Sequence, residues 1–73
     1  MFNSKDKEIV DLLKESSYPL STYQIAKELK ISWSTANLHC FKLKSFGKIE
    51  GDFKESKFGQ GMKMIWWVNR GEE

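Results

Sequence analysis

The sequence predicts an α+β fold in which three helices are followed by a two-stranded β-hairpin. Asparagine and serine stand where each of three helices would begin, and such side chains cap helix N-termini. A glycine follows the third helix, and beyond it the apolar residues change from helical spacing to alternation. The 73 residues are 40% apolar and 14% aromatic, which suits one domain with its own core. We therefore expect a single domain over residues 1–73, with an ordered core at about 3–69.

The first helix is predicted to begin at Asn3, which can cap it. It should end near Ser16, because the residue before Pro19 avoids helical geometry. A very short strand is expected near Pro19 and Leu20. The apolar stripe that should face the core contains Ile9, Val10, Leu12 and Leu13.

The second helix has the clearest start signal. Ser21 and Gln24 have the S-x-x-Q spacing of a capping box, in which each side chain binds the other residue's backbone amide. Leu20 before the cap and Ile25 inside it form the matching hydrophobic staple. The helix should end near Leu29, after only two turns.

The third helix is predicted over about 33–45, with Ser32 as its cap and Gly47 just beyond its end. Only two residues separate Leu29 from this cap. The second and third helices must therefore cross at a tight turn.

Two strands are predicted after the third helix. Apolar and charged residues alternate over 48–54, a loop with two glycines follows, and strand-forming residues fill 62–68. The face that contains Trp66 is assigned to the core, so Trp67 must point to the opposite face and cover another surface or meet a partner. The core face comprises Met64, Trp66 and Val68.

This order of elements resembles the winged helix-turn-helix superfamily of DNA-binding proteins. Residues 20–29, LSTYQIAKEL, look like the second helix of MarR-like and ArsR-like transcriptional regulators. Residues 31–36, ISWSTA, look like the start of their recognition helix, and Leu43 with Gly47-Lys48-Ile49 looks like its end and the entry to the wing. The resemblance covers roughly residues 20–68.

The resemblance implies sequence-dependent binding of double-stranded DNA by a small transcriptional regulator. Helix 33–45 would lie in the major groove, and the hairpin wing would lie on the adjacent backbone or minor groove. The alternative is a winged-helix module for protein–protein interaction that does not bind DNA, because a fold does not dictate its function.

Candidate DNA contacts on helix 33–45 lie away from its core side. A spacing of 100° per residue turns Trp33, Ala36, Cys40 and Leu43 toward the core. Hydroxyl and ammonium groups suit phosphate, and an asparagine can pair with an adenine edge. His39 is expected to be a surface or helix-packing residue rather than to read a base. The candidate contacts are Ser32, Ser34, Thr35, Asn37, Leu38, Phe41 and Lys42.

Leu38 and Phe41 depart from the regulator pattern, which commonly has polar or basic residues there. Three explanations stay open: contact with thymine methyls or sugars, packing against a protein partner, or folding of Phe41 onto the wing. An exposed apolar pair on a small domain often marks an interface.

The middle of the chain is basic. Residues 30–63 contain seven lysines against three acidic residues, whereas residues 1–29 contain four lysines against five acidic residues. A basic segment between weakly acidic ends is expected when one face meets phosphate. The wing residues predicted to contact DNA are Lys54, Lys57, Gln60 and Lys63.

The sequence gives little support for an enzyme, a zinc protein or a membrane protein. His39 is the single histidine and Cys40 the single cysteine, so neither a catalytic constellation nor a zinc site is expected, and no cofactor or small-molecule ligand is inferred. Cys40 is expected to be a small core residue. No apolar stretch approaches a membrane span and no signal peptide is recognisable, so we expect a cytoplasmic protein.

Two further expectations concern assembly and the form of DNA. A homodimer is favoured over a monomer, through the first helix, Phe2, Phe46 or the outward tryptophan. A weaker resemblance connects Asn37, Phe41 and the Gly47-Lys48-Ile49 ending to winged helices that recognise left-handed Z-form nucleic acid. Trp33 and Leu38 stand where that family has basic residues.

Overall fold

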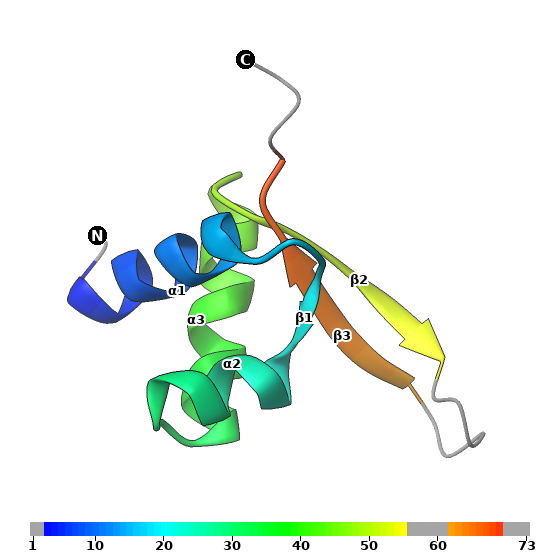
Figure 1. Ribbon diagram of the computed structural model, residues 1–73, viewed down its shortest axis with the longest axis horizontal. Helices are drawn as coiled ribbons and strands as arrows, with labels where there is room; N and C mark the ends of the chain where they lie inside the picture. The colour runs from blue at the N-terminus through cyan, green and yellow to red at the C-terminus, as the bar shows by residue number, and fades with distance from the viewer. Residues whose placement is uncertain (1–2, 56–61, 70–73) are drawn as a thin grey trace.

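The computed structural model describes residues 3–55 and 62–69, and it confirms the predicted α+β winged-helix fold (Figure 1). The element order is α1 (Ser4–Glu15), β1 (Leu20–Ser21), α2 (Thr22–Leu29), α3 (Trp33–Ser45), β2 (Glu50–Glu55) and β3 (Met62–Trp67). None of the helices in the described residues is long and apolar enough to cross a membrane.

The described residues form a sheet of three antiparallel strands in the order β1-β3-β2. The expected short strand is present as β1, which pairs with β3 through Leu20 opposite Trp66. Strands β2 and β3 pair from Glu50 opposite Trp67 to Glu55 opposite Met62. They form the wing, a hairpin that extends away from the helices (Figure 1).

Each helix begins where the sequence predicts. The Asn3 side chain accepts a hydrogen bond from the Asp6 amide at 3.1 Å, and the Asp6 carboxylate accepts one from the Asn3 amide at 2.8 Å. The reciprocal pair at α2 joins Ser21 and Gln24. At α3, the Ser32 hydroxyl accepts from the Thr35 amide at 3.1 Å.

The turn between α2 and α3 depends on a lysine in left-handed backbone geometry. Lys30 has φ 59° and ψ 45°, and it is the residue that ends α2. The next amide, of Ile31, donates to the Ala26 carbonyl at 3.0 Å and so binds an orphan carbonyl of the last turn. Gly47 has the left-handed conformation predicted for it, with φ 76°.

Trp66 lies at the centre of the core. It is fully buried, and its indole N–H donates to the hydroxyl of Thr22 at 2.8 Å. A methyl group at Gly51, the residue of β2 opposite Trp66, would lie 2.3 Å from the indole ring. Only glycine therefore fits at this position. The other buried apolar residues are Ile9, Leu13, Leu20, Ile25, Ala26, Ala36, Cys40, Leu43 and Ile49.

The prediction that Trp33 faces the core is wrong. Its exposed fraction is 54%, whereas Ala36, Cys40 and Leu43 on the same predicted stripe are buried. Both neighbours of Trp33 in the chain, Ser32 and Ser34, are exposed as well. The first turn of α3 has therefore passed the edge of the core, and helical spacing alone does not report where the core ends.

Candidate functional site

Helix α3 presents three different stripes to its surroundings. Ala36, Cys40 and Leu43 are buried, and burial raises the pKa of the Cys40 thiol to about 12. His39 and Lys42 reach α1 through hydrogen bonds. The third stripe, with side chains four residues apart, contains Trp33, Asn37 and Phe41, and these line a hollow that also includes residues of the wing.

We call this space the aromatic hollow, and its volume is about 470 Å³. It lies between the start of α2, the part of α3 from Trp33 to Phe41 and the two wing strands. The lining residues are Ser21, Thr22, Tyr23, Trp33, Asn37, Phe41, Phe53, Met62, Lys63 and Met64. Five of them, Tyr23, Trp33, Phe41, Phe53 and Met62, are large apolar side chains that are nevertheless exposed. Exposed apolar side chains gathered in this way are a common feature of binding surfaces, which makes the hollow a candidate site.

Phe41 packs partly against the wing. Its ring meets the indole of Trp66 edge to face, with centroids 5.0 Å apart and an angle of 89° between the planes. This is a favoured aromatic geometry. Packing onto β3 therefore accounts for one side of the ring, while 42% of Phe41 remains exposed.

Asn37 is the polar group on the α3 side of the hollow. It is half-buried and lines the hollow one turn from both Trp33 and Phe41. No hydrogen bond joins its side-chain amide to another described residue. The amide is thus available to a ligand, between the two aromatic side chains that α3 contributes to the hollow.

The outward face of α3 contains the other predicted contacts. Ser34 is exposed and Leu38 is 71% exposed. Ser32 is exposed too, but its hydroxyl caps the helix and donates to the hydroxyl of Thr35 at 2.9 Å. Ser34 and Leu38 are therefore the most accessible of these side chains.

Lys42 does not lie on that outward face, contrary to the sequence prediction. Its ammonium donates to the carboxylate of Asp6 at 2.7 Å, and the Nδ1 atom of His39 lies 2.7 Å from the other oxygen. Of the two structural roles expected for His39, at the surface or between helices, the structure shows the second. Asp6 is only 1% exposed, so its charge draws both α3 side chains toward α1.

The pKa of Asp6 is lowered to about 2 by this arrangement. Burial acts in the opposite direction and raises the pKa, but the hydrogen bonds from Lys42, the Asn3 amide and His39 together outweigh it. Asp6 is therefore ionised at neutral pH and joins α1 to α3 through a buried charge network.

Two of the predicted wing lysines lie side by side. Lys54 on β2 and Lys63 on β3 are directly opposite in the strand register, and both are exposed. Neither forms an ion pair with another described residue. The other two wing predictions, Lys57 and Gln60, fall outside the described residues.

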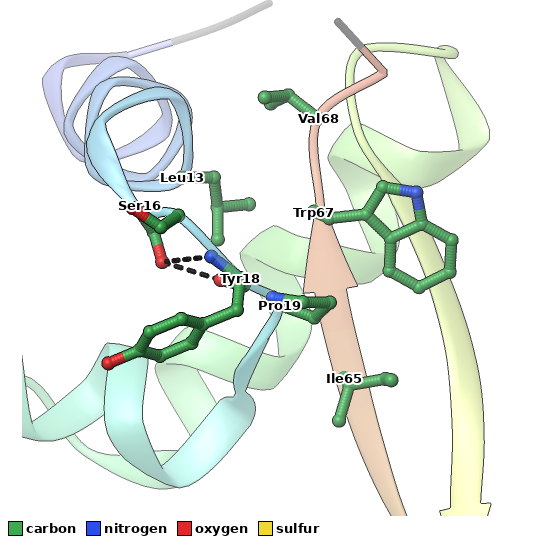
Figure 2. A pocket seen from close by; sticks show the side chains of 8 residues that line it. Leu13, Ser16, Tyr18, Pro19, Ile65, Trp67 and Val68 are labelled. Carbon is green, nitrogen blue, oxygen red and sulfur yellow. Dashed lines mark hydrogen bonds between the residues drawn. The ribbon is translucent and has the colours of Figure 1, made fainter.

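Trp67 points away from the core, as predicted, and lines a second hollow of about 380 Å³. Figure 2 shows Leu13 of α1 and the Tyr18-Pro19 segment on one side of this hollow, with Ile65 and Trp67 of β3 on the other. The Ser16 hydroxyl binds the backbone of Tyr18 and holds the turn after α1.

Two features of the site were not predicted, the stripe of α3 that lines the aromatic hollow and the buried Asp6. The sequence contains a signal for each. Trp33, Asn37 and Phe41 are spaced i, i+4 and i+8, which places them on one helix stripe. Asp6 lies three residues before the buried Ile9, a spacing that puts it on the core side of α1. What the spacing does not reveal is which neighbouring element each stripe faces.

No protein-family model and no curated protein sequence matches this chain. Among solved structures, the chain is similar to a protein of Methanosarcina mazei Go1 described as a "Possible transcriptional regulator", with 18% identity and a TM-score of 0.82. The match covers 96% of this chain and 58% of that protein, so the chain spans little more than half of its length. At this identity the likeness is one of fold. The chain is thus a winged helix whose wing and third helix enclose an aromatic hollow.

Proposed function

We propose that this protein binds double-stranded DNA in a sequence-dependent manner, as a small transcriptional regulator. The outward face of α3, with Ser34 and Leu38, would enter the major groove, and the wing would lie on the adjacent phosphate backbone. The observation that carries the proposal is the pair of exposed lysines at Lys54 and Lys63.

Like charges directly opposite each other destabilise a strand pair. Lys54 and Lys63 have this arrangement, and no described carboxylate neutralises them. A phosphate between the two ammonium groups would convert the repulsion into two attractive contacts. The wing geometry therefore supports an anionic partner.

The outward face of α3 supports contact with a groove. A helix fits the major groove of B-form DNA, and an exposed leucine such as Leu38 can contact the methyl group of thymine. Ser34 can donate to phosphate or to a base edge. The fold that this chain shares with the protein described as a regulator is consistent with the same role.

Salt dependence tests the proposal. Binding of a mixed-sequence duplex should weaken steeply with salt, because each phosphate contact releases counterions. Lys63→Gln should reduce the slope of log affinity against log salt concentration by about 1. Lys7→Gln is the control, since Lys7 lies on α1 and pairs with Asp11. Absence of salt-dependent binding in the unmodified protein would end the proposal.

Chemical-shift mapping of the same titration locates the face. The proposal expects the largest changes at Ser34, Leu38 and the wing lysines. Changes confined to α1 and the second hollow would contradict it. An alternating dC-dG duplex held in the left-handed form belongs in the same series, because Asn37 and Phe41 share one stripe of α3. Tighter binding to that form would favour the Z-form resemblance.

The second candidate is a protein–protein interaction module without DNA binding. The five exposed apolar side chains of the aromatic hollow favour it. It predicts that duplex DNA leaves the spectrum of the protein unchanged at low salt, and that the hollow binds an apolar segment of a partner protein instead.

A further inference from the structure

We infer that the aromatic hollow receives an unstacked nucleobase, so that this protein binds DNA containing an unpaired base more tightly than a fully paired duplex. The inference rests on the proposed function, because it assumes that the strand lies along α3 and the wing. It concerns a different surface from the outward face of α3.

The shape and lining of the hollow suit a planar aromatic ligand. Its volume of about 470 Å³ lies within the roughly 300–1,000 Å³ typical of ligand pockets. Trp33, Tyr23 and Phe53 contribute rings that are more than half exposed. Aromatic side chains that remain exposed in this way are the stacking platforms on which proteins bind unpaired bases.

The amide of Asn37 favours a base over an aliphatic side chain. It is half-buried and has no hydrogen-bond partner among the described residues. A nucleobase edge offers both donors and acceptors to such an amide. A leucine or valine side chain of a peptide would bury the amide and leave it unsatisfied, which costs free energy.

The charges around the hollow favour a phosphate-bearing ligand. Lys63 lines the hollow, and none of the described lining residues is acidic. Lys54 lies opposite Lys63 in the register, and because side chains alternate along a strand this pair belongs to the other face of the wing from Phe53 and Met64. The pair therefore adds positive charge at the border of the hollow rather than inside it. Glu55, opposite Met62, is on the same face of the wing as Met62 but does not belong to the described lining of the hollow.

The same geometry explains a preference for unpaired bases. A base in a matched duplex must be unstacked and unpaired before it can enter a side pocket, and that cost is smallest where the base has no partner. A bulged base would therefore gain the full free energy of stacking in the hollow. A paired base would gain less, because part of that free energy is spent on unpairing it.

The test compares a matched duplex with the same duplex carrying a single bulged 2-aminopurine, both at low salt. We expect the bulged duplex to bind at least about fivefold more tightly, the effect of stacking one base. The fluorescence of 2-aminopurine should fall on binding, because stacking on an aromatic ring quenches it. Trp33→Ala should remove the preference and leave binding of the matched duplex within about twofold.

Two further variants make the test specific. Asn37→Ala should also reduce the preference for the bulge, without removing a ring. Tyr18→Ala is the control, because Tyr18 is 68% exposed yet lies outside the aromatic hollow. Circular dichroism confirms that each variant is folded before binding is measured.

The outcomes separate this inference from the proposed function. Equal affinity for both duplexes, with no effect of Trp33→Ala on either, overturns the inference and leaves duplex binding intact. A Trp33→Ala loss of equal size on both duplexes overturns it too. Failure of both duplexes to bind in a salt-dependent manner overturns the inference together with the proposed function.

Discussion

Asp6 shows how one residue can couple two helices. Its carboxylate caps α1 through the Asn3 amide and binds His39 and Lys42 of α3 at the same time. It is 1% exposed, yet each oxygen has a partner. A buried charge of this kind is tolerated only when it is paired, so the network depends on Asp6 remaining ionised.

Acid should therefore weaken the protein through Asp6. Its pKa is about 2 in the folded state and 3.8 is the ordinary value, so its contribution is complete above pH 3.8 and is lost as pH falls through 2. The free energy of unfolding should fall by about 2 kcal/mol between pH 5 and pH 2 on this account. Urea titrations of the protein and of Asp6→Asn measure it, since the variant lacks this component. Parallel pH profiles of the two proteins would contradict the assignment.

Gly51 is fixed by the residue opposite it. A Cβ atom there would lie 2.3 Å and 2.4 Å from two carbons of the Trp66 ring, and that ring is fully buried and cannot swing aside. The close approach of β2 to the indole is what allows so large a side chain to fill the core.

Gly51→Ala should consequently lower the free energy of unfolding by about 1–3 kcal/mol through overpacking. Gly47→Ala is an informative comparison, because nothing lies within 4 Å of a methyl group there and only the positive φ of 76° opposes it. That backbone strain is worth roughly 1–2 kcal/mol. Chemical denaturation gives both values, and NMR shifts of the Trp66 indole should move in Gly51→Ala alone.

At the scale of elements, the turn between α2 and α3 is the strained connection. Lys30 is the one described non-glycine residue with positive φ. The tight crossing of the two helices requires that geometry, because Ile31 must turn back to bond Ala26 before α3 begins. The side chain of Lys30 is exposed, so the turn does not depend on a packing contact from that side chain.

Lys30→Gly should raise stability by about 0.5–1 kcal/mol. Relief of left-handed strain stabilises the folded state by roughly 1–2 kcal/mol. The extra freedom of glycine in the unfolded chain opposes this gain by about 0.4–1 kcal/mol. Thermal unfolding monitored by circular dichroism checks the direction. A lower midpoint than that of the parent would mean that the lysine side chain stabilises the turn by more than the strain costs.

At the scale of the whole molecule, Trp66 joins the helices to the sheet. Its indole N–H bonds Thr22 at the start of α2, its ring meets Phe41 of α3, and its backbone lies between β1 and β2. The relative placement of wing and α3, and hence the shape of the aromatic hollow, depends on this residue. Homodimer formation, which was expected from the sequence, stays a prediction.

Thr22→Val should separate the hydrogen bond from the packing. The substitution keeps the shape of the side chain but leaves the buried indole N–H without a partner, at a cost of about 1–3 kcal/mol. Thr35→Val is the control, because the Thr35 hydroxyl accepts a hydrogen bond only from the exposed hydroxyl of Ser32. If the two variants lose equal stability in urea, the Thr22 bond contributes nothing special.

The sequence by itself determined the elements and their order. Capping residues act within three positions of the helix they start, and Gly47 acts on its own backbone, so Asn3, Ser21, Ser32 and Gly47 can be interpreted without a tertiary structure. Alternation along β3 likewise assigned Trp66 to the core and Trp67 to the other face. These interactions are local, so the identities of neighbouring residues are enough to predict them.

Only the tertiary structure decided what each side of α3 faces. Helical spacing placed Trp33 on the core stripe and Lys42 outside it, but the core stops at Ala36, and Asp6, 36 residues earlier in the chain, draws Lys42 to α1. The aromatic hollow exists because residues of the wing lie beside Trp33 and Phe41, again over a long separation in sequence. Periodicity fixes the angle of a side chain about its own helix axis. The partner it meets depends on how distant elements pack, and no spacing within one helix contains that information.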